Sequence, residues 1–168
     1  MIFFDTETTG LVKEGTTDPS QQPRIVELAL IRTDRDCREL SRFTTLLNPG
    51  IPIPEEVVKV HGITDAAVAD APKFPAVLGR IISEFREDDT LVAHNLRFDL
   101  MMLVYELQRI DFQWRFPFPH NHVDTVPLSG GKKLEVWSKE VLGTKFTAQS
   151  HRAIDDVERL IACYRSVA

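Results

Sequence analysis

The sequence is poor in cysteine and has no long hydrophobic run. Its 168 residues include two cysteines, Cys37 and Cys163, too few for a disulfide framework and without the spacing of a zinc site. We expect both to be reduced thiols in a cytoplasmic protein. No stretch approaches the roughly 20 apolar residues that cross a bilayer, and the chain begins with a strand-like segment. Neither a membrane span nor a signal peptide is therefore expected.

The sequence also lacks an excess of positive charge. It contains 20 lysines and arginines against 25 aspartates and glutamates, for a net charge of −5. Proteins that bind duplex nucleic acid non-specifically are usually basic, because Lys and Arg supply their phosphate contacts. The charge argues against a large electrostatic footprint on nucleic acid, but not against capture of a single chain end. The length fits one domain over residues 1–168.

The hydrophobic pattern predicts an α/β fold with a mixed sheet. Strands are expected, in chain order, at residues 2–4, 24–32, 42–47, 91–93 and 123–126. Helices are expected to begin near Pro54, to cover 74–85, to follow residue 95, to cover 134–142 and to run from about Ser150 to the C-terminus. The second and third strands should form a hairpin. Residues 13–23, polar and rich in turn formers, are expected to be a flexible surface loop.

Two acids directly follow the first expected strand. Asp5 and Glu7 come after the apolar run 2–4, in the motif FDTETTG. Residues two apart on a strand share a face, so we expect both carboxylates to point the same way. An ordinary strand end with two solvent-exposed acids is the alternative, and the buried run before them argues against it. The backbone N–H groups near Thr6 and Thr8 are candidates for contacts with a nucleotide.

Acids also occur in two later motifs, HNLRFD and HRAIDD. Asp99 ends the first, at the start of an expected helix, where a simple capping acid is the alternative. Asp156 ends the second and lies on the apolar stripe of the last helix, so it should face inward and need a partner. Asp155 instead has arginines three positions before and four after it, and we expect a surface ion pair there. His151 should lie in the first turn of the same helix and face the same pocket.

Acids gathered in one pocket repel each other, so such a site requires cations. Asp5, Glu7, Asp99 and Asp156 offer oxygen ligands only, which suits Mg²⁺ or Mn²⁺ better than zinc. Ions of this kind serve the cleavage of phosphate esters. The sequence therefore predicts a metal-dependent hydrolase.

The three motifs together resemble those of the DEDDh family of 3′–5′ exonucleases, within the ribonuclease H-like superfamily. The likeness is greatest to the proofreading subunits of bacterial DNA polymerase III and their stand-alone relatives. VHGIT at 60–64 and VDT at 123–125 also look like family segments. The resemblance implies a ribonuclease H-like, mixed five-stranded sheet with an N-terminal hairpin and helices on both faces.

The resemblance also implies a site for two divalent ions, Mg²⁺ or Mn²⁺. Asp5 would contact both ions, Glu7 and Asp156 would complete one site, and Asp99 would assist the other. One ion would activate the attacking water and the other would stabilise the leaving 3′ oxygen. His151 would accept the proton of the water.

The substrate implied by the resemblance is a nucleic-acid 3′ end, with DNA favoured over RNA, and the product is a nucleoside 5′-monophosphate. His61, Asn95 and Phe98 would line the pocket for the terminal nucleotide. Phe98 would stack on a base, with core packing as the alternative. The chain ends soon after the last motif, so it offers no tail that would support a polymerase partner.

Three alternatives remain open at this point. The same five residues serve family members that trim short RNA, and the contacts to the 2′-OH that distinguish RNA from DNA are not visible in a sequence. A phosphatase would use Asp5 as a nucleophile, but that scheme favours aspartate where Glu7 stands and has no use for His151. A non-catalytic nucleic-acid binder would not need the complete set of acids and histidine.

Overall fold

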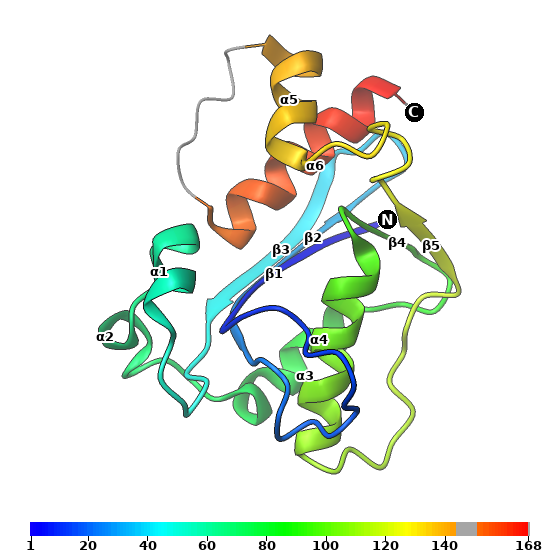
Figure 1. The fold of residues 1–168 in the computed structure, drawn as a ribbon. Coiled ribbons are helices and arrows are strands. Elements are labelled where there is room, and N and C mark those ends of the chain that lie inside the picture. The colour runs from blue at the N-terminus through cyan, green and yellow to red at the C-terminus, as the bar shows by residue number, and fades with distance from the viewer. Residues whose placement is uncertain (144–150, 168) are drawn as a thin grey trace.

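The fold is one mixed sheet with helices on both faces (Figure 1). The structure, a computed structural model, describes residues 1–143 and 151–167. The strands lie in the order β3-β2-β1-β4-β5, with β2 antiparallel to both of its neighbours, β1 and β3, and with β4 and β5 parallel to β1. Their bounds are β1 Ile2–Thr8, β2 Ile25–Thr33, β3 Glu39–Leu46, β4 Thr90–Ala93 and β5 Asn121–Asp124. The predicted α/β fold with its N-terminal hairpin is confirmed.

The helices also follow the expected pattern, with different ends. Their bounds are α1 Glu55–His61, α2 Asp65–Val68, α3 Phe74–Glu84, α4 Leu96–Arg109, α5 Leu134–Leu142 and α6 Ala153–Val167. The short helix α2 was not expected; the side chain of Thr64 caps it by accepting the N–H of Ala67. The expected start of the last helix, Ser150, lies outside the described residues. None of the described helices has the length and apolar character that crossing a bilayer requires.

The last strand ends two residues earlier than the hydrophobic pattern predicts. The carboxylate of Asp124 accepts the backbone N–H groups of Val126, at 2.9 Å, and of Asn95, at 3.1 Å. A side chain that binds the backbone two residues further on forms a turn. The expectation of a strand at 123–126 is therefore wrong at its C-terminal end, because the acid in the middle of that segment closes a turn.

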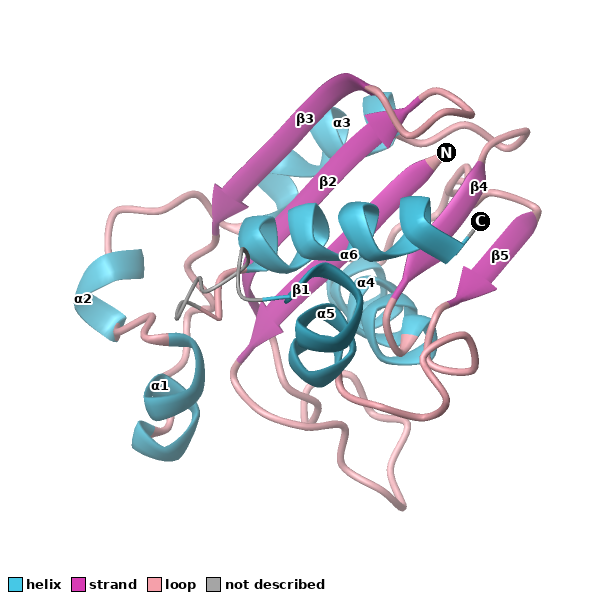
Figure 2. Cartoon of the chain, turned by 90° about the horizontal axis from the view of Figure 1, so that it is seen from above, coloured by secondary structure: helices cyan, strands magenta, loops and turns pink. Residues whose placement is uncertain are grey.

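The side chains of β1 alternate between two hydrophobic cores. Phe4 packs in the core beneath α3 and α4, whereas Phe3 packs in the core beneath α5 and α6. Figure 2 shows α5 and α6 across one face of the sheet and α3 and α4 behind the other. Because successive strand residues alternate, Asp5 and Glu7 continue the row of Phe3 and Thr6 continues the row of Phe4. The two acids thus share the α6 face, as expected.

The strand β1 continues past its parallel neighbour β4. It pairs with β4 through Ile2 and Phe3, whereas on its other side it pairs with β2 from Ile2 to Thr8. The chain leaves the sheet after Ala93 to begin α4. The second half of β1 is consequently flanked on one side by the first turn of α4 instead of a strand, and the acids lie on this half.

The loop at 13–23, expected to be flexible, is held in place by two side chains. Gln22 accepts the N–H of Lys13 and donates to the carbonyls of Lys13 and Thr16. Arg109, near the end of α4, donates to three backbone carbonyls between residues 19 and 23. These contacts satisfy part of the polar backbone of the loop and fasten it against α4; the segment is a surface loop, as expected.

Phe85 lies at the centre of the core beneath α3 and α4, and its loss should be costly. It is 1% exposed, and its ring centroid lies 6.2 Å from that of Phe4 and 5.1 Å from that of Phe116. Phe85→Ala should lower the free energy of unfolding by about 3–5 kcal/mol, because it leaves a cavity among rings that cannot collapse. Urea denaturation followed by circular dichroism measures this. Trp114→Ala, at a side chain 81% exposed, is the matched aromatic control and should change stability by less than about 0.5 kcal/mol. Equal losses in the two variants would contradict the assignment of this core.

Candidate active site

Three carboxylates meet where β1 passes beneath α6. One oxygen from each of Asp5, Glu7 and Asp156 lies within 4.8 Å of the other two. The first two come from alternate positions of β1, and Asp156 comes from the first turn of α6. The structure therefore brings together acids that are about 150 residues apart in the sequence, with all three half-buried.

Asp99 reaches the same strand from the opposite side. It lies in the first turn of α4, is buried, and accepts two hydrogen bonds from Thr6, one from the backbone N–H at 2.9 Å and one from the hydroxyl at 2.7 Å. It is close enough to Asp5 for its negative charge to raise the pKa of that carboxyl. The alternative of a simple capping acid is wrong, because Asp99 binds β1. The backbone N–H of Thr6 is bound to Asp99, and a nucleotide contact near Thr6 stays a prediction.

Burial and mutual repulsion make the acids of this site hard to ionise. Burial, followed by the charges of Asp99 and Asp156, raises the pKa of Asp5 well above its usual range. Burial and the charge of Asp156 raise the pKa of Glu7 to about 8. Burial also raises the pKa of Asp99 to about 7, although the hydrogen bonds from Thr6 oppose the shift. The ligand atoms of this site are all carboxylate oxygens, and they repel one another. Such a site fits divalent cations, because these ions take oxygen ligands and would relieve the repulsion.

Asp156 has a cationic partner inside the protein. Burial raises the pKa of this carboxyl, and the nearby guanidinium of Arg159 opposes the shift. The Nη1 atom of Arg159, which is buried, lies 2.7 Å from Oδ1 of Asp156. The expectation of an inward-facing acid with a partner is confirmed. Arg152, one of the two arginines at helical spacing from Asp155, pairs with Glu27, and the charge of Asp155 also helps to raise the pKa of Arg152.

His151 lies just outside α6. The helix begins at Ala153, so the expectation of a place in its first turn is wrong. The side chain is exposed, and it is near enough to Asp156 for its charge to lower the pKa of that carboxyl. An imidazole at the rim of the acid group, open to water, is placed to exchange protons with solvent.

Two residues that are expected to contact the substrate, His61 and Thr8, bind backbone around the site. His61 is buried; its Nδ1 accepts the N–H of Ile63 at 3.0 Å, and its Nε2 lies 3.3 Å from the carbonyl oxygen of Thr8. The hydroxyl of Thr8 donates to the carbonyl of Gly10 at 2.7 Å. The ring of His61 and the hydroxyl of Thr8 therefore tie the 61–63 turn and the end of β1 to neighbouring backbone. Their part in substrate binding stays a prediction.

The other two candidates lie beside Asp99 at the start of α4. Asn95 is exposed and has φ 71°, a left-handed conformation that asparagine tolerates at such positions. Phe98 is half-buried against the core, which leaves part of its ring accessible. Both residues therefore border Asp99, and their contact with a terminal nucleotide stays a prediction.

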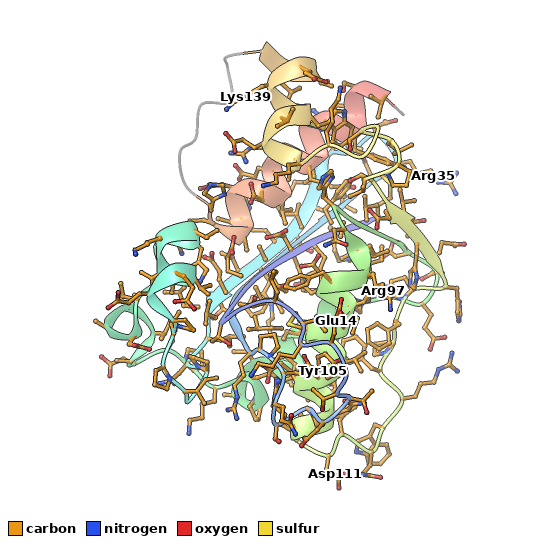
Figure 3. The ribbon with its side chains drawn as sticks, in the orientation of Figure 1. Glu14, Arg35, Arg97, Tyr105, Asp111 and Lys139 are labelled. Carbon is orange, nitrogen blue, oxygen red and sulfur yellow. The ribbon has the colours of Figure 1, made fainter. Side chains whose placement is uncertain are left out.

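A hollow of about 550 Å³ opens beside this turn, between α4 and the loop that follows β1. Thr17 lines it from the loop, Arg97 and Tyr105 line it from α4, and Asp124 lines it from β5. Figure 3 labels Arg97 and Tyr105 on α4 and Glu14 on the loop that follows β1. Asp124, which lines the hollow, is close enough to Asp99 for its charge to help raise the pKa of that carboxyl.

The sequence reasoning missed one acid of this region, Glu27 on β2. It is opposite Glu7 in the β1–β2 register and is almost fully buried. A signal was available, since Glu27 interrupts the apolar segment IVELALI and a charged residue in a buried strand requires a partner. The identity of that partner, Arg152, was not readable from the sequence.

Comparisons with known proteins agree on one family. A family model of the RNase T type, described as "Exonuclease", matches residues 2–164. A "DNA polymerase III subunit epsilon-like protein" of Rhodobacter capsulatus is 46% identical over 103 residues, 61% of this chain and 14% of that protein. The "DNA polymerase III subunit epsilon" of Treponema pallidum is 36% identical over 126 residues, 75% of this chain and 53% of that protein. The chain therefore spans about half of the second relative and much less of the first.

Solved structures show the same fold. E. coli exonuclease I in complex with a dA16 oligonucleotide superposes with a TM-score of 0.76 at 20% identity, over 99% of this chain and 40% of that one. The nuclease domain of 3′hExo, a DEDDh family member bound to rAMP, superposes with a TM-score of 0.73 at 19% identity, over 98% of this chain and 88% of that one. The ribonuclease H-like architecture expected from the motifs is thus confirmed.

The raised pKa values predict that the metal-free protein loses stability as the pH rises. An acid whose pKa is higher in the folded state than in the unfolded chain binds more protons when folded. Its contribution to the free energy of unfolding is therefore fully present below about pH 4 and is lost as the acid ionises in the folded state. With the pKa of Glu7 near 8 and that of Asp99 near 7, the loss should extend from about pH 5 to 8. We expect a decrease in the free energy of unfolding of about 2–4 kcal/mol over this range.

Urea denaturation in EDTA at a series of pH values measures this decrease. Glu7→Gln should flatten the curve of unfolding free energy against pH. Glu55→Gln, at an exposed glutamate of α1, should give the same curve as the unmodified protein. Added Mg²⁺ should restore stability at pH 8, because the ion binds the folded state. A curve that is flat in EDTA would contradict the crowding of acids at this site.

Proposed function

The chain belongs to the RNase T family of exonucleases, and from this premise we propose that it is a metal-dependent 3′–5′ exonuclease that removes nucleoside 5′-monophosphates from nucleic-acid ends. The observation that carries the proposal is the convergence of Asp5, Glu7 and Asp156 within 4.8 Å, with Asp99 held beside them by Thr6. Clustered acids that repel one another in the absence of cations are typical of the active site of a metal-dependent hydrolase.

The four acids of the site would hold two divalent ions, Mg²⁺ or Mn²⁺. Asp5, Glu7 and Asp156 would share one ion, and Asp5 with Asp99 would hold the second. When bound, such ions supply the Lewis acidity that activates water and stabilises the leaving 3′ oxygen. Thr6 keeps Asp99 aimed at the edge of β1, and Arg159 limits the repulsion between Asp156 and the acids of β1.

His151 would act as the proton acceptor of the reaction. Its side chain is exposed at the rim of the acid group and lies within electrostatic reach of Asp156. A neutral imidazole there can take a proton from the attacking water and then release it to solvent, because solvent reaches the ring. The acids themselves are poorly suited to this step, since they would be occupied by cations.

The terminal nucleotide would lie against the first turn of α4. Phe98 has a partly accessible ring for stacking on a base, and Asn95 is exposed beside it. DNA is the favoured substrate, in line with the complex of exonuclease I with dA16. A 3′–5′ exoribonuclease is the second candidate, in line with the binding of rAMP by 3′hExo.

Cys37 and Cys163 are free thiols, which suits the cytoplasm as the place of action.

A side-by-side digestion tests this function. Single-stranded DNA, mismatched duplex and short RNA, each labelled for 3′-end release, are incubated with the protein in Mg²⁺ or Mn²⁺. We expect release of nucleoside 5′-monophosphates, fastest from DNA, and its loss in EDTA. Asp5→Ala should lower the rate at least a thousandfold, because a lost metal ligand removes several kcal/mol of transition-state stabilisation. If this variant kept more than about a tenth of the original rate, the metal role of Asp5 would be wrong.

His151→Ala tests the proton acceptor. The turnover number should fall by about 10²–10⁴, because the variant has no group to accept the proton of the water. The decline of the rate at acid pH that arises from protonation of this ring should also disappear. His120→Ala, at another exposed histidine, is the control and should match the unmodified protein. An unchanged acid limb in His151→Ala would remove His151 from this role.

A further inference from the structure

Glu27 is a buried acid next to the proposed active site, and it is not part of the carboxylate group. It is 1% exposed, lies on the central part of the sheet, and is directly opposite Glu7 in the β1–β2 register. Its charge adds to the repulsion that raises the pKa values of Asp5 and Glu7. A buried acid that destabilises the metal-free site in this way is expected to make a favourable contribution through its other contacts.

Among the described residues, the start of α6 binds the carboxylate of Glu27. Nε of Arg152 lies 3.0 Å and 2.9 Å from the two carboxylate oxygens, and Nη2 of Arg152 lies 2.5 Å from Oε1. The backbone N–H of Ala153, the first residue of α6, donates to Oε2 at 2.9 Å. One carboxylate thus neutralises a guanidinium and satisfies an N–H group at the start of the helix, which has no partner within the helix itself.

Two functional residues flank these contacts. His151 immediately precedes Arg152, and Asp156 lies one turn after Ala153. Because His151 is outside the helix, the regular geometry of α6 does not determine where its imidazole points. The residues that follow it are instead fastened to β2, the strand that pairs with β1 beside the acids.

We propose that Glu27 is a positioning residue that, through Arg152 and the N–H of Ala153, fixes the entry to α6 so that His151 and Asp156 both face the acids of β1. This inference rests on the proposed exonuclease function for the role of His151. Glu27 acts through other residues and does not contact a reacting atom. Its charge is essential to the role, since glutamine would replace one carboxylate oxygen by an NH2 donor and would leave the guanidinium without a counter-charge.

Glu27→Gln tests the inference at nearly constant volume. The turnover number should fall about 10- to 100-fold, because groups that orient ligands and bases have effects of this size. The KM for single-stranded DNA should change less than about threefold, because no substrate contact is lost. Arg152→Gln should give the same loss, and the double variant should be no worse than either single variant, because the two residues act as a unit. Arg152→Lys, which keeps the charge, should recover part of the rate.

A matched control separates positioning from general stability. Glu84 is also a buried glutamate, 4% exposed, paired with Arg80 and bound by the hydroxyl of Ser41 at 2.7 Å, but it lies on α3 in the other core. Glu84→Gln should lower the thermal midpoint as Glu27→Gln does and leave the turnover number unchanged when both are assayed well below unfolding. If Glu27→Gln also kept the full turnover number, Glu27 would be a stabilising residue only and the inference would be overturned.

Mn²⁺ binding gives a readout that does not depend on turnover. Calorimetric titration of Mn²⁺ should show an affinity about tenfold lower in Glu27→Gln, because Asp156 is no longer held against β1, and unchanged in Glu84→Gln. If the unmodified protein binds Mn²⁺ but digests none of the substrates, the proposed function fails and the titration alone decides the positioning role. An unchanged Mn²⁺ affinity in Glu27→Gln would then overturn it.

Discussion

Repulsion among buried carboxylates is the constraint on which the rest of this structure depends. Asp5, Glu7 and Asp156 lie within 4.8 Å of one another and Asp99 lies close beside them, so burial and like charge raise their pKa values. The protein tolerates the arrangement because buried neighbours carry compensating groups. Arg159 faces Asp156, and the N–H and hydroxyl of Thr6 face Asp99. These groups do not cancel all of the repulsion between the carboxylates. A divalent cation would relieve the rest, and this makes cation binding favourable.

The sheet makes this gathering possible because β1 is longer than β4. Where β4 ends, the chain turns into α4 and delivers Asp99 to the edge of β1 that a further strand would otherwise cover. From the other face, α6 delivers Asp156 to the row of Asp5 and Glu7. The strand thus receives acids from both sides at one place. A strand paired along its full length on both edges would have no open edge for Asp99.

Much of this could be predicted from residues that are close in sequence. The apolar run 2–4 predicted a buried strand, and the two-residue spacing of Asp5 and Glu7 predicted a shared face, because both follow from residues that are neighbours in the sequence. The prediction of the last strand failed at its C-terminal end, because Asp124 binds the backbone two residues further on and closes a turn. The sequence pattern also did not show that the loop at 13–23 is held by Gln22 and by Arg109 from the end of α4.

The sequence by itself determined the fold class, the inward-facing acids and the oxygen-only chemistry of the site, since these follow from local periodicity and residue type. Only the tertiary structure decided the partners: that Arg152 binds Glu27, that Thr6 is used by Asp99, and that His151 precedes its helix. The physical reason is that a buried charge must be balanced by whichever group the packed chain places beside it. That group comes from another element, at a separation that no local pattern encodes.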